Sequence, residues 1–149
     1  QTVYFAPGPV ICEINKEMMK EILSIHPILH INEKELLDYT GETSIDAGVK
    51  RLYRQNGNLI IVTTGEKGAV YFDGEHTETV SGRTAGVTDT IGAGDSHVAA
   101  VMAGLSKGKD LRESIALANE VAANIVEIQG PIMTKEEFDK RMRGRALLI

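Results

Sequence analysis

A short run of small residues in front of a predicted helix places the strongest constraint on this chain. Residues 92–94 read Gly-Ala-Gly, Asp95 follows, and the stretch 97–105 has the composition of a helix. Small residues allow a tight turn that brings backbone N–H groups close to a ligand, and a helix directs the positive end of its dipole to the same place. The pattern therefore predicts an anion site at a loop-to-helix junction.

Asp95 lies inside this predicted anion site, where a carboxylate would repel phosphate unless it takes part in the chemistry. It could accept a proton from an attacking hydroxyl, as phosphoryl transfer requires. The tetrapeptide Gly-Ala-Gly-Asp also occurs at ordinary loop-to-helix junctions, where the aspartate is a simple N-cap. These four residues alone leave both interpretations open.

The longer string Asp-Thr-Ile-Gly-Ala-Gly-Asp, residues 89–95, resembles the signature of the ribokinase-like (PfkB) carbohydrate kinases. The resemblance implies a layered α/β/α fold with a largely parallel sheet, present here as its C-terminal portion. It also implies an ATP-dependent kinase that transfers the γ-phosphate to a hydroxyl of a sugar or nucleoside. Asp95 would then be the general base, and the amides of Gly92, Ala93 and Gly94 would hold the developing charge.

Two further motifs resemble parts of the family's nucleotide site. Asn32 and Glu35 match an Asn-x-x-Glu motif that helps to position Mg²⁺ and its waters, and oxygen ligands suit that ion. Such a pair is also common as local capping of a helix. Thr63, Gly65 and Gly68 match a Thr-x-Gly-x-x-Gly turn that lies along the phosphates and ribose of the nucleotide.

Two other predictions concern the nucleotide base and a monovalent cation. Asn119 falls where family members place a residue beside the adenine, although it could also lie on an exposed helix face. Asp89, with carbonyls around Ile91 and Gly130, matches a loop that binds a monovalent cation, often K⁺, in some members. Asp89 could equally hold the shape of this loop as an Asx-turn residue.

Hydrophobic patterning predicts strands separated by helices, which is typical of an α/β fold with a largely parallel sheet. Strands are expected at 2–6, 26–31 and 59–63, with a hairpin formed by 69–72 and 77–80. Helices are expected around 18–23, 33–39, 47–53, 97–105, 111–128 and 135–142. No repeat, linker or low-complexity tract interrupts the pattern, so a single domain is predicted over residues 1–149.

Composition argues against several classes of function. The net charge is −5 and the basic residues are scattered, which argues against nucleic-acid binding. No apolar run approaches the length of a membrane span and no signal-peptide pattern is present, so we expect a cytoplasmic protein without a membrane partner. The four histidines have no metal-binding spacing, and a single cysteine, Cys12, fits a reducing compartment.

The resemblance also implies a longer parent protein, because the family's sugar pocket lies mainly in an N-terminal half. We therefore expect a small-molecule sugar or nucleoside substrate, a homodimer through the absent N-terminal lid, and no activity from these 149 residues alone. A hydroxymethylpyrimidine or pyridoxal kinase of the same fold and a non-catalytic nucleotide-binding module stay open as alternatives. His97, two residues past Asp95, is given no role: it could touch substrate or face solvent.

Overall fold

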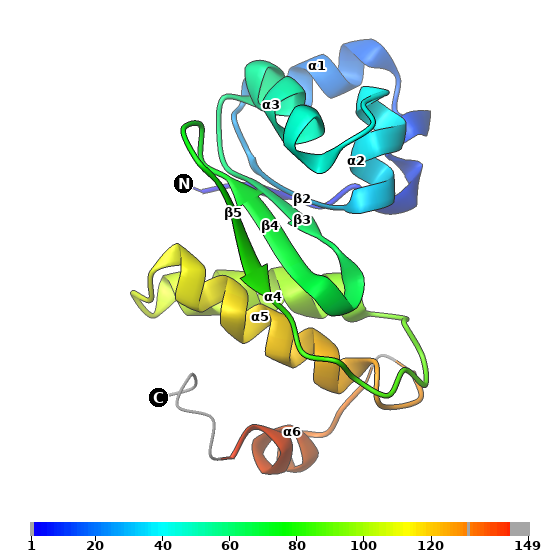
Figure 1. The fold of residues 1–149 in the computed structure, drawn as a ribbon, viewed down its shortest axis with the longest axis vertical. Coiled ribbons are helices and arrows are strands. Elements are labelled where there is room, and N and C mark those ends of the chain that lie inside the picture. The colour runs from blue at the N-terminus through cyan, green and yellow to red at the C-terminus, as the bar shows by residue number, and fades with distance from the viewer. Residues whose placement is uncertain (1, 131, 144–149) are drawn as a thin grey trace. The chain divides into compact units, whose positions relative to one another are not determined.

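The computed structural model of the protein describes residues 2–130 and 132–143 (Figure 1). Its elements follow the chain in this order: β1 (Tyr4–Phe5), the 3₁₀ helix η1 (Gly8–Glu13), α1 (Lys16–Ser24), β2 (Ile28–Asn32), α2 (Glu33–Thr40), α3 (Ile45–Asn56), β3 (Ile60–Thr63), the 3₁₀ helix η2 (Gly65–Lys67), β4 (Gly68–Phe72), β5 (Thr77–Ser81), α4 (Ala93–Ser106), α5 (Leu111–Ile125) and α6 (Lys135–Met142). No helix in these described ranges is both long and apolar enough to cross a membrane.

The described residues divide into two compact units. The first unit comprises those within Gln1–Thr64 and Ala69–Thr79, and the second comprises those within Gly65–Gly68 and Val80–Ile149. The first unit holds α1, α2, α3 and most of the strand residues, whereas the second holds α4, α5 and α6. The predicted site residues are distributed between the two units.

The five strands form one mixed sheet in the order β1-β2-β3-β4-β5. β1, β2 and β3 are parallel to one another, whereas β4 runs antiparallel to β3. β4 and β5 flank the predicted hairpin turn at Asp73, whose carboxylate Oδ1 accepts hydrogen bonds from the amides of Glu75 (2.9 Å) and His76 (2.8 Å). The sequence thus predicted both the parallel strands and the hairpin, and the hairpin makes the sheet mixed.

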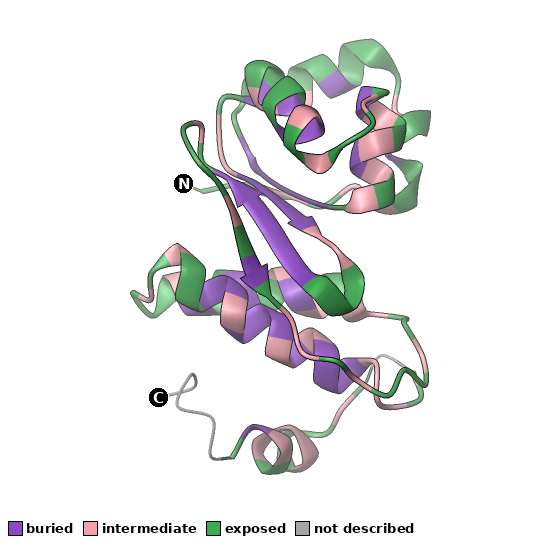
Figure 2. Ribbon diagram, in the orientation of Figure 1, coloured by how far each residue is buried: buried purple, intermediate pink, exposed green. Residues whose placement is uncertain are grey.

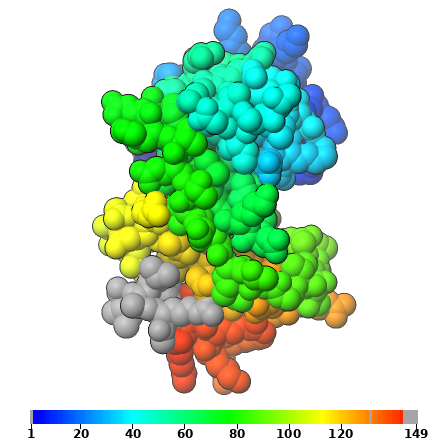
Figure 3. Space-filling model, viewed as in Figure 1, coloured from blue at the N-terminus to red at the C-terminus, as the bar shows by residue number. Residues whose placement is uncertain are grey.

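Alternating residues of the parallel strands build the core of the first unit. Leu29 and Ile31 of β2 pair in register with Ile60 and Val62 of β3, so their side chains share one face of the sheet. Helices α1, α2 and α3 pack on this face, and Figure 3 shows the side chains of α2 and α3 in one continuous surface. The buried cluster also contains Ile11, Met19, Leu23, Leu36, Val49, Leu52 and Phe72. Ile61, on the opposite face of β3, is only 1% exposed, which confirms the prediction of a strand covered on both faces.

The second unit is built on the antiparallel packing of α4 against α5, which follow one another through a short turn. The two helices lie in close contact at Gly104, where an added Cβ would lie 2.6 Å from Oγ of Ser114. Figure 2 shows the row of buried positions along α5. The small residues that the sequence places in these helices therefore serve close helix packing.

Several element boundaries differ from the sequence prediction. The segment after β1 forms the 3₁₀ helix η1 in place of a plain turn, and β1 itself has only two residues. α5 ends at Ile125, earlier than the predicted residue 128, because the Val126 carbonyl accepts hydrogen bonds from the amides of Thr88 (2.7 Å) and Asp89 (3.2 Å). α4 begins at Ala93 and not at His97, which changes the geometry of the predicted anion site.

Candidate active site

Three of the predicted site residues lie at the carboxyl ends of parallel strands in the first unit. Asn32 ends β2 and Thr63 ends β3, and the two are direct partners in the register of the sheet. Glu35 lies in the first turn of α2, immediately after β2. Ligands of open α/β sheets bind at this end of the strands. The structure therefore brings Asn32, Glu35 and Thr63 together at one edge of the sheet.

Asn32 and Glu35 form a complete capping box at the start of α2. The side chain of Asn32 accepts a hydrogen bond from the Glu35 amide (2.8 Å), and Oε2 of Glu35 accepts one from the Asn32 amide (3.0 Å). Nδ2 of Asn32 also donates to Oε1 of Glu35 (2.7 Å). The capping interpretation is thus confirmed. Each carboxylate oxygen accepts one of these bonds and retains a lone pair, so the pair also has the donor chemistry that suits a water-mediated Mg²⁺.

Gly65 begins the 3₁₀ turn η2 and Gly68 follows it, both in the second unit. Gly68 has a φ of +103°, and an added Cβ there would lie 2.2 Å from the Val80 carbonyl oxygen and 2.3 Å from the amide nitrogen of Gly82. That amide donates a hydrogen bond to the Lys67 carbonyl (3.0 Å). The backbone at Lys67–Gly68 therefore lies in direct contact with the backbone at Val80–Gly82, and no side chain fits at Gly68.

The predicted anion site consists of the N-cap and the first turn of α4. Gly92 is the N-cap, with a φ of +79°, and no side chain caps this helix end. Asp95 lies in the first turn and is exposed, so the interpretation of Asp95 as a simple N-cap is wrong. First-turn amides have no partner within their own helix. The Ala93 amide donates to the Thr90 carbonyl at 3.3 Å. Helix starts of this kind can bind anions through their free amides.

Asp89 ties the segment before α4 to the turn after α5. One carboxylate oxygen accepts a hydrogen bond from the Ile91 amide (3.0 Å), and the other accepts one from the Gly130 amide (3.1 Å). These bonds lower the pKa of Asp89, because they stabilise the ionised carboxylate. The Asx-turn interpretation is confirmed, and the structure also brings together the three residues of the predicted cation loop.

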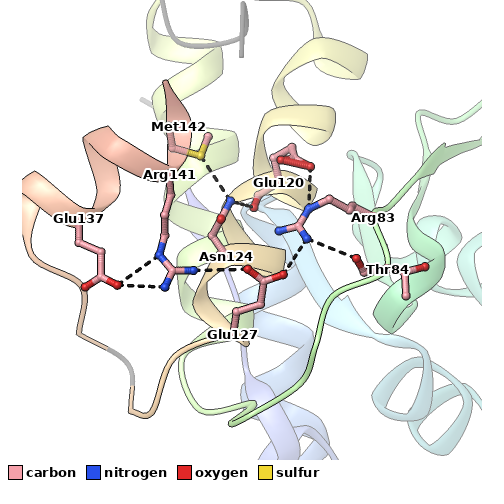
Figure 4. Close-up of polar contacts among 8 residues, drawn as sticks. All are labelled: Arg83, Thr84, Glu120, Asn124, Glu127, Glu137, Arg141 and Met142. Atoms are coloured by element: carbon pink, nitrogen blue, oxygen red, sulfur yellow. Dashed lines mark hydrogen bonds and ion pairs between the residues drawn. The ribbon is translucent and has the colours of Figure 1, made fainter. Parts of the chain in front are cut away.

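A half-buried network of ion pairs supports the same two segments (Figure 4). Arg83 contacts Glu120 through Nε (3.2 Å) and Glu127 through Nη1 (2.7 Å). The second carboxylate oxygen of Glu127 contacts Arg141 of α6 at 3.4 Å, and Arg141 also pairs with Glu137 at 3.0 Å. Glu127 thus connects the segment after β5 with α6. Partial burial makes such pairs more valuable than exposed ones.

His97 and Asn119 are both buried, with exposed fractions of 2% and 7%. His97 Nε2 lies 3.0 Å from Oδ1 of Asn119, whose Nδ2 donates to the carbonyls of Val80 (2.9 Å) and Ser81 (3.2 Å). Burial lowers the pKa of His97 to about 4. The expectation that His97 touches substrate or faces solvent is therefore wrong, as is the alternative that Asn119 lies on an exposed helix face. The predicted role of Asn119 beside adenine stays a prediction.

The sequence did not indicate three residues that shape the second unit. Gly82 carried no signal beyond its place after a strand, and the partners of Arg83 lie 37 and 44 residues away. Glu127 appeared to belong to α5, whereas it lies in the turn that follows it. Ion pairs between residues so far apart in the sequence leave no pattern in the local sequence that would predict them. Among the described residues, no group of histidine, cysteine, aspartate and glutamate side chains is arranged to hold a metal directly.

A family model for pfkB family carbohydrate kinases matches residues 3–137. This chain belongs to the pfkB family. It is 31% identical over 127 residues to an uncharacterized sugar kinase, YegV, of Escherichia coli, covering 83% of this chain and 40% of that protein. It is 29% identical over 117 residues to a cytidine kinase of Thermococcus kodakarensis, covering 77% of this chain and 42% of that protein.

Solved structures of pfkB relatives share the fold. A Vibrio cholerae fructokinase with fructose, ADP and calcium ion bound superposes with a TM-score of 0.76 and 26% identity, covering 87% of this chain and 46% of that one. A double mutant of this fructokinase with fructose, ADP and potassium ion bound gives a TM-score of 0.73 at 24% identity over the same shares of the two chains. The ribokinase-like α/β fold implied by residues 89–95 is therefore confirmed. The chain spans less than half the length of each of these relatives.

Proposed function

We propose that this chain forms the nucleotide-binding half of an ATP-dependent kinase that phosphorylates a hydroxyl of a sugar or nucleoside. The observation that carries the proposal is the uncapped start of α4, which presents first-turn amides and Asp95 together. Membership of the pfkB family supports it, as do the sugar and cytidine kinases among the relatives.

Asp95 is the proposed general base. Its carboxylate accepts the proton of the acceptor hydroxyl while that oxygen forms a bond to the γ-phosphorus and the bond to the ADP oxygen breaks. The amides of Gly92, Ala93 and Gly94 face the charge that develops on the transferred group. Backbone donors at a helix start are fixed before the reaction begins, so they stabilise this charge without reorganisation.

The strand ends of the first unit would serve the metal and the phosphates. Mg²⁺ supplies charge neutralisation to the phosphate oxygens when it is bound. Glu35 and Asn32 would hold waters of the ion, since the capping box fixes both side chains while leaving lone pairs open. Thr63, Gly65 and Gly68 would lie along the nucleotide, where glycines permit close backbone approach.

The loop held by Asp89 would bind a monovalent cation beside the phosphates. The carbonyls around Ile91 and Gly130 are the ligands proposed for K⁺, and Asp89 fixes the two segments that carry them. A fructokinase of the same fold was solved with potassium ion bound. Turnover should then increase when K⁺ replaces a bulky organic cation at constant ionic strength.

The decisive experiment measures phosphate transfer by the protein that carries this sequence, against a panel of sugars and nucleosides with ATP and Mg²⁺. Asp95→Asn should lower kcat about 10²–10⁴-fold with little change in nucleotide affinity, because it removes the base but keeps the shape. Asp110→Asn is the matched control: it makes the same change at the start of α5, where asparagine still caps the helix. Equal turnover of Asp95→Asn and the parent protein would contradict the proposal. ATP binding without transfer to any acceptor would favour a non-catalytic module.

A further inference from the structure

The buried face of α4 fixes the direction in which Asp95 points. Asp95 is exposed and His97 is buried, and two residues correspond to about 200° around a helix. The two side chains therefore leave α4 in nearly opposite directions. Any rotation of α4 about its axis that moves His97 must also move Asp95.

Most of the contacts between α4 and α5 do not fix how far α4 is rotated about its axis. Ala100, Val101 and Gly104 line the buried face of α4, and small apolar side chains pack with little directional preference. The close approach of Gly104 to Ser114 sets the distance between the helices at one point. A hydrogen bond is directional and weakens steeply when its angle changes. Near the start of α4, the His97–Asn119 bond supplies such a constraint.

The hydrogen bonds of Asn119 determine how this contact is made. Two carbonyls of β5, those of Val80 and Ser81, accept from Nδ2 of Asn119, so its two N–H groups are used. Its Oδ1 must then accept, which requires His97 to carry the proton on Nε2. With both amide donors committed to backbone, Asn119 has no N–H group left for a nucleotide base.

We propose that His97 and Asn119 are positioning residues for the phosphoryl transfer: they anchor the start of α4 to the end of β5 and thereby hold Asp95 and the first-turn amides in their reactive orientation. This inference rests on the proposed function of Asp95. Asn119 is assigned here to orientation of α4 through its bond to His97. The pair acts through Asp95, so its loss should lower kcat and leave the KM for ATP almost unchanged.

The test compares two substitutions of His97 in the protein that carries this sequence. His97→Gln keeps an N–H donor that reaches Asn119, and should retain kcat within about threefold. His97→Phe keeps a planar ring but removes the donor, and should lower kcat about 10–100-fold, as small misplacements of catalytic groups do. Met102→Leu, on the exposed side of the same helix, is the control and should change neither kcat nor the KM for ATP. Equal kcat values for His97→Phe and His97→Gln would overturn the proposal.

A double-substitution cycle separates positioning from general destabilisation. If His97 acts through Asp95, His97→Phe should cause little further loss of kcat in an Asp95→Asn background. Multiplicative losses would show that His97 acts independently of Asp95 and would overturn the proposal. A parent protein without any transfer activity would overturn the proposed function instead, and this outcome is seen before any variant is made.

Imidazole NMR of the parent protein gives a readout that needs neither activity nor a folded variant. Nitrogen shifts at neutral pH should identify a neutral His97 ring with its proton on Nε2. A ring protonated on Nδ1 would mean that the bond to Asn119 is not made, and it would overturn the assignment of this pair.

Discussion

The two units of this chain are held together by different kinds of interaction. The first unit buries large aliphatic side chains between one sheet face and three helices. The second unit relies on small residues at a helix contact, backbone segments in direct contact, and buried polar groups such as His97, Asn119 and Asn124. Apolar packing tolerates small shifts, whereas hydrogen bonds fix directions. In the unit that holds the proposed base, buried hydrogen bonds fix the orientation of α4 and α5 in addition to their apolar packing.

The largest effect is expected in the core of the first unit. Leu36 is fully buried and contacts Gly48, where an added Cβ would lie 2.9 Å from its side chain. Leu36→Ala should lower the free energy of unfolding by about 2–5 kcal/mol, measured by denaturant titration. Gly48→Ala alone should also destabilise, because its new methyl group meets Leu36.

Combining these two substitutions tests the contact between Leu36 and Gly48 directly. In Leu36→Ala/Gly48→Ala the new methyl group enters the space that Leu36 vacates, so the double variant should lose less stability than the sum of the two single losses. Hydrogen exchange should increase in β2, α2 and α3 more than in α4 and α5. Strict additivity, or equal increases in both units, would contradict the packing described here.

Acid should act mainly on the second unit. The pKa of His97 is about 4 in the folded protein against 6.5 for an ordinary histidine, so the unfolded chain binds an additional proton between these values. The contribution of the neutral His97 ring to the free energy of unfolding is therefore fully present above pH 6.5. As the pH falls toward 4 this contribution is lost, which lowers the free energy of unfolding by about 3 kcal/mol in total. Urea titrations at several pH values should show this loss, and the His97→Gln variant should show a smaller one. An identical pH dependence in both proteins would contradict the assignment.

The contribution of ion pairs to stability should also differ between the units. Glu127→Gln weakens contacts with both Arg83 and Arg141, whose side chains are half-buried, and should cost about 1–2 kcal/mol of stability. Lys34→Gln removes the partner of Asp38 in an exposed pair of the first unit and should cost less than about 0.5 kcal/mol. Thermal unfolding of both variants measures the difference, and similar shifts would contradict the importance of partial burial.

The smallest expected difference in stability concerns two capping boxes, one in each unit. Glu35→Gln and Glu113→Gln make the same change at the third residue of α2 and α5, and each should cost less than about 1 kcal/mol. Only Glu35→Gln should raise the Mg²⁺ concentration needed for half-maximal phosphate transfer, because Glu35 is the proposed partner of the ion. Equal Mg²⁺ dependence in the two variants would leave Glu35 with a capping role alone.

Local patterns predicted the strands, the hairpin and most helices, because hydrophobic period and glycine placement act over a few residues. The signature 89–95 predicted the family for the same reason. The start of α4 was misplaced by four residues, since glycine and aspartate are poor helix formers that here occupy the first turn. The end of α5 depended on the carbonyl of Val126, which accepts from a distant segment.

The supporting contacts of the candidate site could not be predicted in this way. Arg83 meets Glu127, and Asn119 meets both His97 and the end of β5, only after the chain has folded. No local property of a histidine in a helix indicates whether it is buried. The sequence therefore singles out the residues proposed for chemistry, whereas the contacts that orient them are seen only in the folded structure.

The backbone crossing at Gly68 and Gly82 affects how a mutational scan of this protein should be interpreted. Almost every side chain at Gly68 would displace the Val80 carbonyl, so substitution there should abolish ATP binding whether or not Gly68 ever touches the nucleotide. Intolerance at this position would look like that of a binding residue. Gly65 has open space for an added Cβ, but its φ of +66° strains any side chain there, so a loss of ATP affinity at Gly65 must also be compared with a measurement of stability.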